Sequence, residues 1–397
     1  MIFRIRNGVL LVGAALIGWA GWATYTYFFD TQLPTLHIAG IEPDGYYAGD
    51  IACQVAGTKK GDLAIFLDGQ PLITSFRFNA RTPHPFTIPS KTIANGKHVL
   101  KVHLTDATFK KNRVADECTF YVDNVPLQAN FVRTEGDYKV FQGRTLHLQF
   151  QVNKDIKQAV IHTLDHSYTC FSESKNSNVY ECFIPINCEE APNEYLLTAQ
   201  LCDKVGNQLN VDTKFQVVLY PFKKQTLNVD ANKMEEEKKI GLAMQELERA
   251  LDELHGRSPQ EKLWRGAFCT PIDVARITCE FGTIRTTQEK GRYMHKGIDV
   301  VNMPKSVVWA PQDGMLVLKE RYAYSGNTVV IDHGFGIFTL FFHLDNFADI
   351  NVGQKVAKGN PIGTIGKTGY ATGYHLHWEM RINNIQVDPM QWTKASF

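Results

Sequence analysis

Apolar and polar residues alternate one by one through much of the chain between residues 33 and 222. The run LHLQFQV, from Leu146 to Val152, alternates without a break, and residues 195–201 are apolar at every second position. A period of two is typical of half-buried β-strands. Turn signals such as Asp68-Gly69 separate these runs, which predicts a region of short strands joined by tight turns.

The strand-rich region also contains an internal echo. LKVHLTD (100–106) aligns with LTAQLCD (197–203), and each is followed by a polar loop and a closing apolar-polar strand. A period near 100 residues with short alternating strands predicts two consecutive immunoglobulin-like β-sandwiches, over 33–126 and 127–222. They resemble the immunoglobulin-like modules of bacterial envelope proteins, which implies a spacer or a surface that binds a cell-wall or envelope protein partner.

The period changes after the strand-rich region. Apolar residues between 240 and 254 recur at helical spacing, with charged residues elsewhere: Ile240, Ala243, Met244, Leu247, Leu251 and Leu254. This pattern predicts an amphipathic helical linker over 230–256, and Gly256 is a plausible stop. Three alternatives remain open: a helix packed on a neighbouring domain or serving as a stalk, a self-associating coiled coil, and a helix that lies over an active-site cleft and restrains activity.

The N-terminus carries the longest uncharged stretch of the chain. Arg4 and Arg6 lie in the short segment 1–7, which precedes the uncharged residues 8–29. About 22 residues at roughly 1.5 Å each span about 33 Å, enough to cross the hydrocarbon of a bilayer. The positive flank predicts a single-pass inner-membrane anchor with the N-terminus inside and the rest of the chain outside, in the periplasm. A cleaved signal peptide is the alternative, and it gives the same exported location.

Charge and composition narrow the function classes. The 42 Lys and Arg residues against 41 Asp and Glu residues give a formal net charge of +1, which does not indicate nucleic acid as a partner. The hydrophobic fraction of 44% predicts folded domains rather than a disordered chain. A length of 397 residues predicts two to four of them.

The cysteines fit an exported protein. Eight cysteines, an even number, favour disulfides outside the cytosol. The sequence contains no Cys-x-x-Cys motif, which argues against a structural zinc ribbon. Sequence alone does not choose among the possible connectivities. Pairing of neighbours predicts the bonds Cys53–Cys118, Cys170–Cys182, Cys188–Cys202 and Cys269–Cys279.

Candidate chemistry gathers near the C-terminus, where five of the 13 histidines follow residue 290. His295 and Asp299 lie four apart, and His375 and His377 lie two apart in the run GYHLHWEM. A catalytic zinc ion takes three protein ligands and leaves a fourth position for water. His295, Asp299 and one histidine of the pair would supply such a set, and the other histidine would stand beside the metal to handle protons.

The segment around these histidines resembles a known family. ITCEFGTIR (277–285), HKGID (295–299), YSGNTVVIDHGFGIFTLFFHL (324–344) and VGQKVAKGNPIGTIGKTGYATGYHLHWEMR (352–381) follow one another in the order of LytM-type domains. These domains form the M23, or lysostaphin-like, family of zinc endopeptidases. The resemblance covers about a third of the chain. It implies a mostly antiparallel β domain over 262–397, so the fold expected for the whole chain is mainly β.

The resemblance also implies roles for individual residues. His295, Asp299 and His377 would be the ligands of one zinc ion per chain. His343 and His375 would flank the open position as the catalytic residues, with His375 as the base and His343 as the stabiliser, or with these roles exchanged.

Three further residues receive predictions. Glu379 alternates to the face of His375 and His377, which predicts that it orients an imidazole. Arg285 would contact either a substrate carboxylate or a local acid. Two residues, rather than the usual one, precede Arg285 after Gly282, and this departs from the family's pattern. His333 is predicted to be structural.

These features together predict an exported zinc-dependent endopeptidase that hydrolyses peptide bonds in peptidoglycan stems or cross-links. Some members of the family have lost metal ligands and act as non-catalytic binding modules that activate other cell-wall hydrolases. Here all five site positions are filled. The third alternative is a structural envelope protein, and it would predict decay of these positions.

Overall fold

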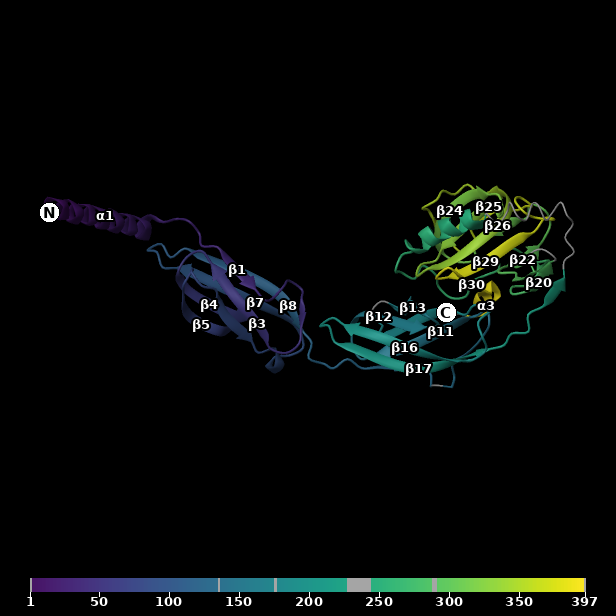
Figure 1. Cartoon of the computed structure of the whole chain (residues 1–397), viewed down its shortest axis with the longest axis horizontal. Helices are drawn as coiled ribbons and strands as arrows, with labels where there is room; N and C mark the ends of the chain where they lie inside the picture. The colour runs from purple at the N-terminus through teal and green to yellow at the C-terminus, as the bar shows by residue number, and fades with distance from the viewer. Residues whose placement is uncertain (1, 135, 175–176, 227–243, 288–290, 396–397) are drawn as a thin grey trace. The chain divides into compact units, whose positions relative to one another are not determined.

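Strands dominate the computed structural model, which describes residues 2–134, 136–174, 177–226, 244–287 and 291–395 (Figure 1). The chain divides into two units. The first contains Met1–Pro126 with Lys204–Asn207, and the second contains Leu127–Asp203 with Gln208–Phe397. The mainly β character predicted from the alternating pattern is confirmed.

The first unit begins with helix α1 (Ile2–Phe29), which covers the predicted transmembrane anchor over 8–29. Among the described residues, no helix has the length and apolar character that a membrane span requires. The structure therefore does not support the predicted anchor.

A β-sandwich follows α1 in the first unit. One sheet has the strand order β1-β3-β6 and the other has the order β2-β8-β7-β4-β5. The strands are β1 (Leu36–Ala39), β2 (Tyr46–Tyr47), β3 (Ile51–Gly57), β4 (Gly61–Leu67), β5 (Gln70–Phe78), β6 (His84–Ile88), β7 (Gly96–Asp106) and β8 (Arg113–Val122), with a 3-10 turn at Ser90–Thr92. Side chains such as Val55, Leu63 and Leu100 from the two sheets share one buried core.

The second unit opens with another β-sandwich. Its sheets have the orders β10-β17-β16-β12-β13 and β14-β15-β11-β9. The strands are β9 (Ala129–Phe131), β10 (Lys139–Phe141), β11 (Thr145–Val152), β12 (Ile156–Thr163), β13 (His166–Thr169), β14 (Phe171–Ser172), β15 (Val179–Pro185), β16 (Glu194–Asp203) and β17 (Gln208–Val218). In β11 the buried side chains Leu146, Leu148 and Phe150 occupy every second position, as the sequence predicted.

The internal echo corresponds to a repeated topology. LKVHLTD lies in β7 and LTAQLCD lies in β16, and each strand forms an antiparallel hairpin with the strand that follows it. In both five-stranded sheets a short first strand adds in parallel beside that hairpin. The echo also ends on the same feature, because Asp106 and Asp203 are both buried and both ion-paired to a lysine. The two sandwiches are therefore copies of one architecture, and their immunoglobulin-like identity stays a prediction.

The C-terminal domain is built on a sheet of ten strands. Its main path runs β19-β22-β29-β26-β25-β24-β27, with β28 and β30 paired to β26 and β29, and β23 paired to β28. The strands are β19 (Arg276–Cys279), β22 (Ile298–Val301), β23 (Val307–Trp309), β24 (Gly314–Tyr322), β25 (Gly326–Asp332), β26 (Ile337–Phe347), β27 (Lys355–Val356), β28 (Pro361–Ile365), β29 (Leu376–Ile382) and β30 (Ile385–Val387). A smaller sheet contains β18 (Lys224–Thr226), β20 (Ile284–Thr287) and β21 (Gly291–Met294), and helix α3 (Pro389–Lys394) follows β30.

The predicted amphipathic helix forms over residues 244–255, and residues 230–243 of the predicted linker lie outside the described residues. Leu247 and Leu251 are buried against apolar side chains of β24, β25 and β26, among them Leu340 and Phe342. The helix therefore packs on a neighbouring sheet, one of the three alternatives that the sequence left open.

The second sandwich and the C-terminal domain share a hydrophobic core. Phe171 and Phe183 of the sandwich pack with Trp264, Met380 and Trp392 of the C-terminal domain. This shared core explains why both belong to one unit.

The predicted disulfides are wrong, because all eight cysteines are free thiols. Cys188 belongs to the core of the C-terminal domain, whereas its expected partner Cys202 lies in β16 of the second sandwich. Cys279 faces the predicted metal ligands rather than Cys269. The Cys53–Cys118 and Cys170–Cys182 thiols lie near each other in the sandwich cores but stay unbonded.

Candidate metal centre

Two of the predicted metal ligands face each other across neighbouring strands. Strand β22 pairs antiparallel with β29, and Asp299 lies directly opposite His377 in the register. Residues opposite each other in an antiparallel pair project to the same face of the sheet. The Asp299 Oδ1 atom consequently lies 2.7 Å from His377 Nδ1.

His295 joins this pair from the segment that follows β21. Its backbone nitrogen donates to the Thr283 carbonyl, and its own carbonyl accepts from Gly282. The ring nitrogen Nδ1 lies 3.3 Å from the Glu280 carbonyl, which fixes the tautomer that leaves Nε2 free to bind a metal. His295 Nε2 lies 3.1 Å from Asp299 Oδ1 and 3.2 Å from His377 Nδ1.

These three atoms have the spacing that a tetrahedral zinc ion needs. At metal–ligand distances of about 2.0–2.2 Å, two donors of a tetrahedral ion lie about 3.3–3.6 Å apart. The observed separations of 2.7, 3.1 and 3.2 Å are slightly shorter, so the donors already converge on one point. Two imidazole nitrogens and a carboxylate oxygen are a donor set that zinc binds in catalytic sites. The residues present therefore fit the ion.

Gly297 leaves the room that His377 occupies. A Cβ atom at residue 297 would lie 2.5 Å from His377 Nε2 and 3.0 Å from the Trp378 carbonyl oxygen. Any other side chain there would push the imidazole away from Asp299, which explains the glycine in HKGID.

Burial and close contact shift the pKa values of the three ligands. Burial raises the pKa of Asp299, but hydrogen bonds to His295 and His377 outweigh it and hold this pKa far below its usual range. Burial likewise opposes the charged form of His377, yet Asp299 and Glu379 raise its pKa to about 9. The pKa of His295 is raised because hydrogen bonds to Asp299 and Cys279 more than offset burial. Without a metal, the cluster therefore holds protons that a metal would displace.

His343 reaches the centre from an irregular point of β26. The pairing of β25 with β26 shifts register between the partners of Asn327 and Val329, and His343 has a φ of 63°. This extra residue is a β-bulge, which turns the side chain where simple alternation would not. His343 Nδ1 donates to the Thr368 carbonyl over 2.8 Å, so Nε2 of the neutral ring is unprotonated. Burial, followed by the neighbouring His375 and His377, lowers the pKa of His343 to about 3.

His375 lies immediately before β29, where it forms an isolated bridge with Gly366. Its ring lies 4.8 Å from the His343 ring between centroids, and its Nε2 atom is 3.8 Å from Asp299 Oδ1. The Nδ1 atom is 2.9 Å from the Gly373 carbonyl, which leaves Nε2 as the acceptor that faces the ligands. His343 and His375 therefore both flank the ligand cluster, as the resemblance implied.

Glu379 lies behind His377, as its alternation along the strand predicted. Glu379 Oε1 accepts from His377 Nε2 over 3.1 Å, so the proton stays on Nε2 and Nδ1 is free to bind a metal. The Phe342 ring stacks on the His377 imidazole at 5.2 Å between centroids. The metal ligand is thus held at its edge and on one face.

Arg285 contacts a local acid, one of the two alternatives that the sequence left open. Its Nη2 atom lies 3.5 Å from Asp299 Oδ2, the oxygen that does not face His377.

Cys279 was missed by the sequence reasoning because it was assigned to a disulfide. Its strand position is directly opposite Asp299, and its sulfur lies within 4.8 Å of donor atoms of His295 and Asp299.

His333 is buried away from the ligand cluster and fully hydrogen-bonded. Its Nδ1 lies 2.7 Å from the Asp313 carbonyl, and its Nε2 lies 2.8 Å from Thr339 Oγ1. Burial lowers its pKa to about 4, so the ring is neutral at physiological pH. These contacts agree with the structural role predicted for His333.

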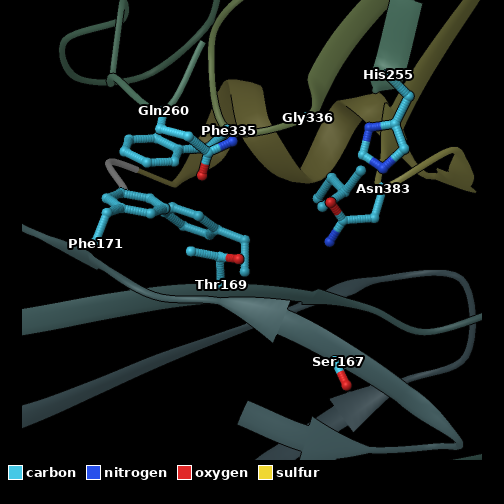
Figure 2. Close-up of a pocket in the computed structure, with 10 residues that line it drawn as sticks. Ser167, Thr169, Phe171, His255, Gln260, Phe335, Gly336 and Asn383 are labelled. Atoms are coloured by element: carbon cyan, nitrogen blue, oxygen red, sulfur yellow. The ribbon is translucent and has the colours of Figure 1, made fainter. Parts of the chain in front are cut away.

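A cavity of about 220 Å³ lies apart from the metal centre, between the second sandwich and the C-terminal domain (Figure 2). The stacked rings of Phe171 and Phe335 line one part, and His255 and Asn383 line another. None of the predicted metal ligands or catalytic histidines is among the lining residues.

Residues 293–389 match peptidase family M23, and this segment contains all three converging ligands and both flanking histidines. The chain carries an M23 peptidase domain. The resemblance seen in the sequence motifs is confirmed.

Two curated relatives illustrate the similarity. The peptidoglycan DD-endopeptidase ShyC of Vibrio cholerae is 33% identical over 121 residues, which are 30% of this chain and 28% of ShyC. The DD-carboxypeptidase/endopeptidase Mpg of Neisseria gonorrhoeae is 38% identical over 136 residues, which are 34% of this chain and 30% of Mpg. The chain thus spans less than a third of the length of each relative.

Solved structures are also similar to the chain. A structure of the antimicrobial peptidase lysostaphin from Staphylococcus simulans is 28% identical, with a TM-score of 0.26, and covers 30% of this chain and 49% of its own. An M23 peptidase candidate from Pseudomonas aeruginosa is 22% identical, with a TM-score of 0.45, and covers 64% of this chain and 95% of its own.

Proposed function

We propose that this protein is a zinc-dependent endopeptidase that hydrolyses peptide bonds in peptidoglycan stems or cross-links. The observation that carries the proposal is the convergence of His295, Asp299 and His377, with donor atoms no more than 3.2 Å apart and two further histidines beside them. The relative ShyC, which is named as a peptidoglycan DD-endopeptidase, supports the substrate class.

The ligands of the proposed zinc ion are His295 through Nε2, Asp299 through Oδ1 and His377 through Nδ1. Zinc bound there supplies Lewis acidity toward the scissile carbonyl and brings the pKa of bound water to about 7. Arg285 and Glu379 hold Asp299 and His377 in place through their remaining polar atoms.

His375 is the proposed general base. Its Nδ1–H is held by the Gly373 carbonyl, so Nε2 accepts a proton on the side that faces the ligand cluster. The His343 ring, whose centroid lies 4.8 Å from that of His375, offers a second unprotonated Nε2 atom. Burial and its two histidine neighbours lower the pKa of His343 to about 3, so its ring stays neutral. His343 therefore acts as the hydrogen-bonding partner of the reacting groups, and His375 takes the proton.

Peptidoglycan hydrolysis requires an exported catalytic domain, so we propose that the C-terminal domain acts in the periplasm. The N-terminal segment predicted this location through a single-pass inner-membrane helix, and its membrane attachment stays a prediction. Binding of an envelope protein by the immunoglobulin-like sandwiches also stays a prediction. Protease treatment of intact and permeabilised spheroplasts tests the location: a periplasmic domain is degraded in both, and a cytoplasmic one only after permeabilisation.

Digestion of isolated peptidoglycan tests the proposed activity. The purified full chain, with its zinc restored, is incubated with peptidoglycan, and the released fragments are identified by mass spectrometry. We expect peptide-bond cleavage that a chelator abolishes and that His343→Ala and His375→Ala each reduce at least about a hundredfold. Absence of chelator-sensitive cleavage with retained binding to peptidoglycan would instead favour a non-catalytic module that activates other hydrolases.

A further inference from the structure

Strand β29 carries a row of polar side chains that continues past the metal ligand. His377, Glu379 and Arg381 occupy every second position, so all three project to the same face of the sheet. All three are at least nine-tenths buried. Glu379 uses one carboxylate oxygen for His377 Nε2, at 3.1 Å, and the other for Arg381 Nε, at 2.8 Å.

The row ends on the helix over residues 244–255. Glu248 receives two hydrogen bonds from the Arg381 guanidinium, one of 2.6 Å from Nη1 and one of 2.9 Å from Nη2. The Arg381 side chain is 3% exposed, whereas the Glu248 side chain is 41% exposed at the rim. An unbroken series of hydrogen bonds therefore joins a residue of the helix to a metal ligand that lies 129 positions later in the chain.

We propose that Glu248 is a positioning residue for the metal centre, which acts on His377 through Arg381 and Glu379. This inference rests on the metal centre of the proposed function. It makes the helix part of the metal-binding structure, which differs from the restraint that the sequence left open.

The alternation of charge along this row explains how Glu248 can affect His377. With zinc bound, the row would pass from the cation to a neutral His377, then to the anionic Glu379, the cationic Arg381 and the anionic Glu248. With Glu248 present, the guanidinium is shared between two carboxylates. Without Glu248, the buried charge of Arg381 is compensated by Glu379 alone, because buried charges require a partner. Glu379 is then drawn toward Arg381 and accepts the His377 Nε2 proton less strongly.

The result matters for metal binding because the partner of a ligating histidine sets its orientation and basicity. A weaker acceptor at Nε2 lowers the electron density at Nδ1 and loosens the ring. The position of Glu248 is in turn fixed by helix packing, since the neighbouring Leu247 is buried against the β24–β26 surface. Helix docking and metal affinity are therefore coupled.

Zinc affinity of the full chain tests the proposal. Four variants are compared by competition with a chromophoric chelator: Glu248→Gln, Glu379→Gln, the double variant, and the control Glu253→Gln. Glu253 lies on the same helix, is 73% exposed and pairs only loosely with Arg257, at 3.9 Å. The control removes the same charge from the same helix without touching Arg381.

We expect Glu379→Gln to raise the zinc Kd about ten- to a hundredfold, the range for a direct partner of a metal ligand. Glu248→Gln should raise it at least about threefold, a smaller effect because it acts through two intermediates. Glu253→Gln should leave the Kd unchanged. The double variant should bind zinc no more weakly than Glu379→Gln, because the series is already broken there.

Two results overturn the proposal: an unchanged zinc Kd in Glu248→Gln, or additive effects in the double variant. Thermal unfolding of the zinc-free proteins and the visible spectrum of the Co²⁺-loaded proteins separate positioning from loss of folding. We expect a shifted Co²⁺ spectrum in Glu248→Gln with a folded zinc-free protein. A wild type that binds zinc tightly but cleaves no peptidoglycan refutes the proposed function and leaves this test intact.

Discussion

The proposed metal ligands depend on a glycine that carries no chemistry of its own. Gly297 lies two residues before Asp299, and a Cβ atom there would meet His377 Nε2 at 2.5 Å. The position of the His377 ring thus depends on a space that only glycine leaves. This contact gives a sharp test of the geometry.

We expect Gly297→Ala to raise the zinc Kd at least about tenfold, because the methyl group displaces the His377 ring from its partner Glu379. Gly373→Ala is the matched control, since a Cβ atom at Gly373 meets nothing within 4 Å. Competition with a chelator measures both. Equal zinc affinities for the two variants would contradict the placement of His377.

The raised pKa of His377 predicts how the zinc-free protein responds to pH. Burial lowers this pKa, but Asp299 and Glu379 raise it to about 9, above the ordinary value of 6.5. A raised folded-state pKa contributes stability that is complete below pH 6.5 and is lost as the pH rises through 9. We expect the unfolding free energy of the zinc-free protein to fall by about 3 kcal/mol between pH 6.5 and 9, on the scale of 1.36 kcal/mol per pKa unit.

Denaturant unfolding at pH 6, 7.5 and 9 measures this loss, with His377→Gln as the control that removes the titrating group. The difference between wild type and control should shrink as the pH rises. A difference that stays constant or grows with pH would show that the folded-state pKa of His377 is not raised.

The proposed site residues could be named from the sequence, because zinc chemistry favours these ligand types and the family resemblance implied which histidine of the 375/377 pair would bind. His295, Asp299 and His377 were named from the motifs, and the structure brings their donor atoms together. Cys279 was missed because the even number of cysteines suggested that it forms a disulfide. The strand register that places it opposite Asp299 cannot be read from the sequence. Arg381 could have been predicted to lie on the same face as His377 and Glu379, because it follows Glu379 by two residues in the same strand.

Strand β26 shows what simple alternation leaves out. Simple alternation through the run FTLFFHL, residues 338–344, describes a regular strand. The strand instead contains a bulge, and His343 adopts a φ of 63°, which is unfavourable for a residue with a Cβ atom. A bulge depends on the register of the partner strand, so the sequence of one strand does not predict it.

This backbone conformation predicts an order of stability among two inactive variants. His343→Gly should be more stable than His343→Ala by about 1 kcal/mol, because glycine adopts a positive φ without the steric cost that alanine pays. Denaturant unfolding of both zinc-free variants measures the difference. An alanine variant as stable as the glycine variant would argue against the positive φ at residue 343.

The helix over residues 244–255 illustrates a different limit. The spacing of its apolar residues correctly predicted both the helix and the face that is buried, which carries Leu247 and Leu251. The target of that face was left open, because periodicity describes one surface and not its partner. The bond from Glu248 to Arg381 joins residues 133 positions apart, and no local pattern marks such a pair.

In the second unit, the C-terminal domain and the second sandwich are joined by a shared core rather than only by a linker. Trp392 is buried between Phe183 of the sandwich and Phe268 of the C-terminal domain, and its indole nitrogen donates to Thr145 Oγ1 over 3.0 Å. The repeat period predicted a domain at 127–222, and the family resemblance implied a separate one at 262–397. Contacts between domains follow from tertiary packing, which a repeat period does not report.

We expect Trp392→Ala to destabilise the sandwich and the C-terminal domain together, by about 3–5 kcal/mol, because it empties a fully buried site between them. Calorimetry should show one transition for this unit in the wild type, shifted to lower temperature in the variant. The exposed Met303→Ala serves as the control. Two transitions, of which the variant shifts only one, would show that the domains unfold independently.

The metal centre itself is tested most directly by anomalous scattering from a crystal of the zinc-loaded protein, recorded above and below the zinc absorption edge. We expect one zinc peak per chain, within about 2.0–2.2 Å of His295 Nε2, Asp299 Oδ1 and His377 Nδ1. A fully loaded crystal with no peak between these three atoms, or with the zinc ion bound at other residues, would contradict the account.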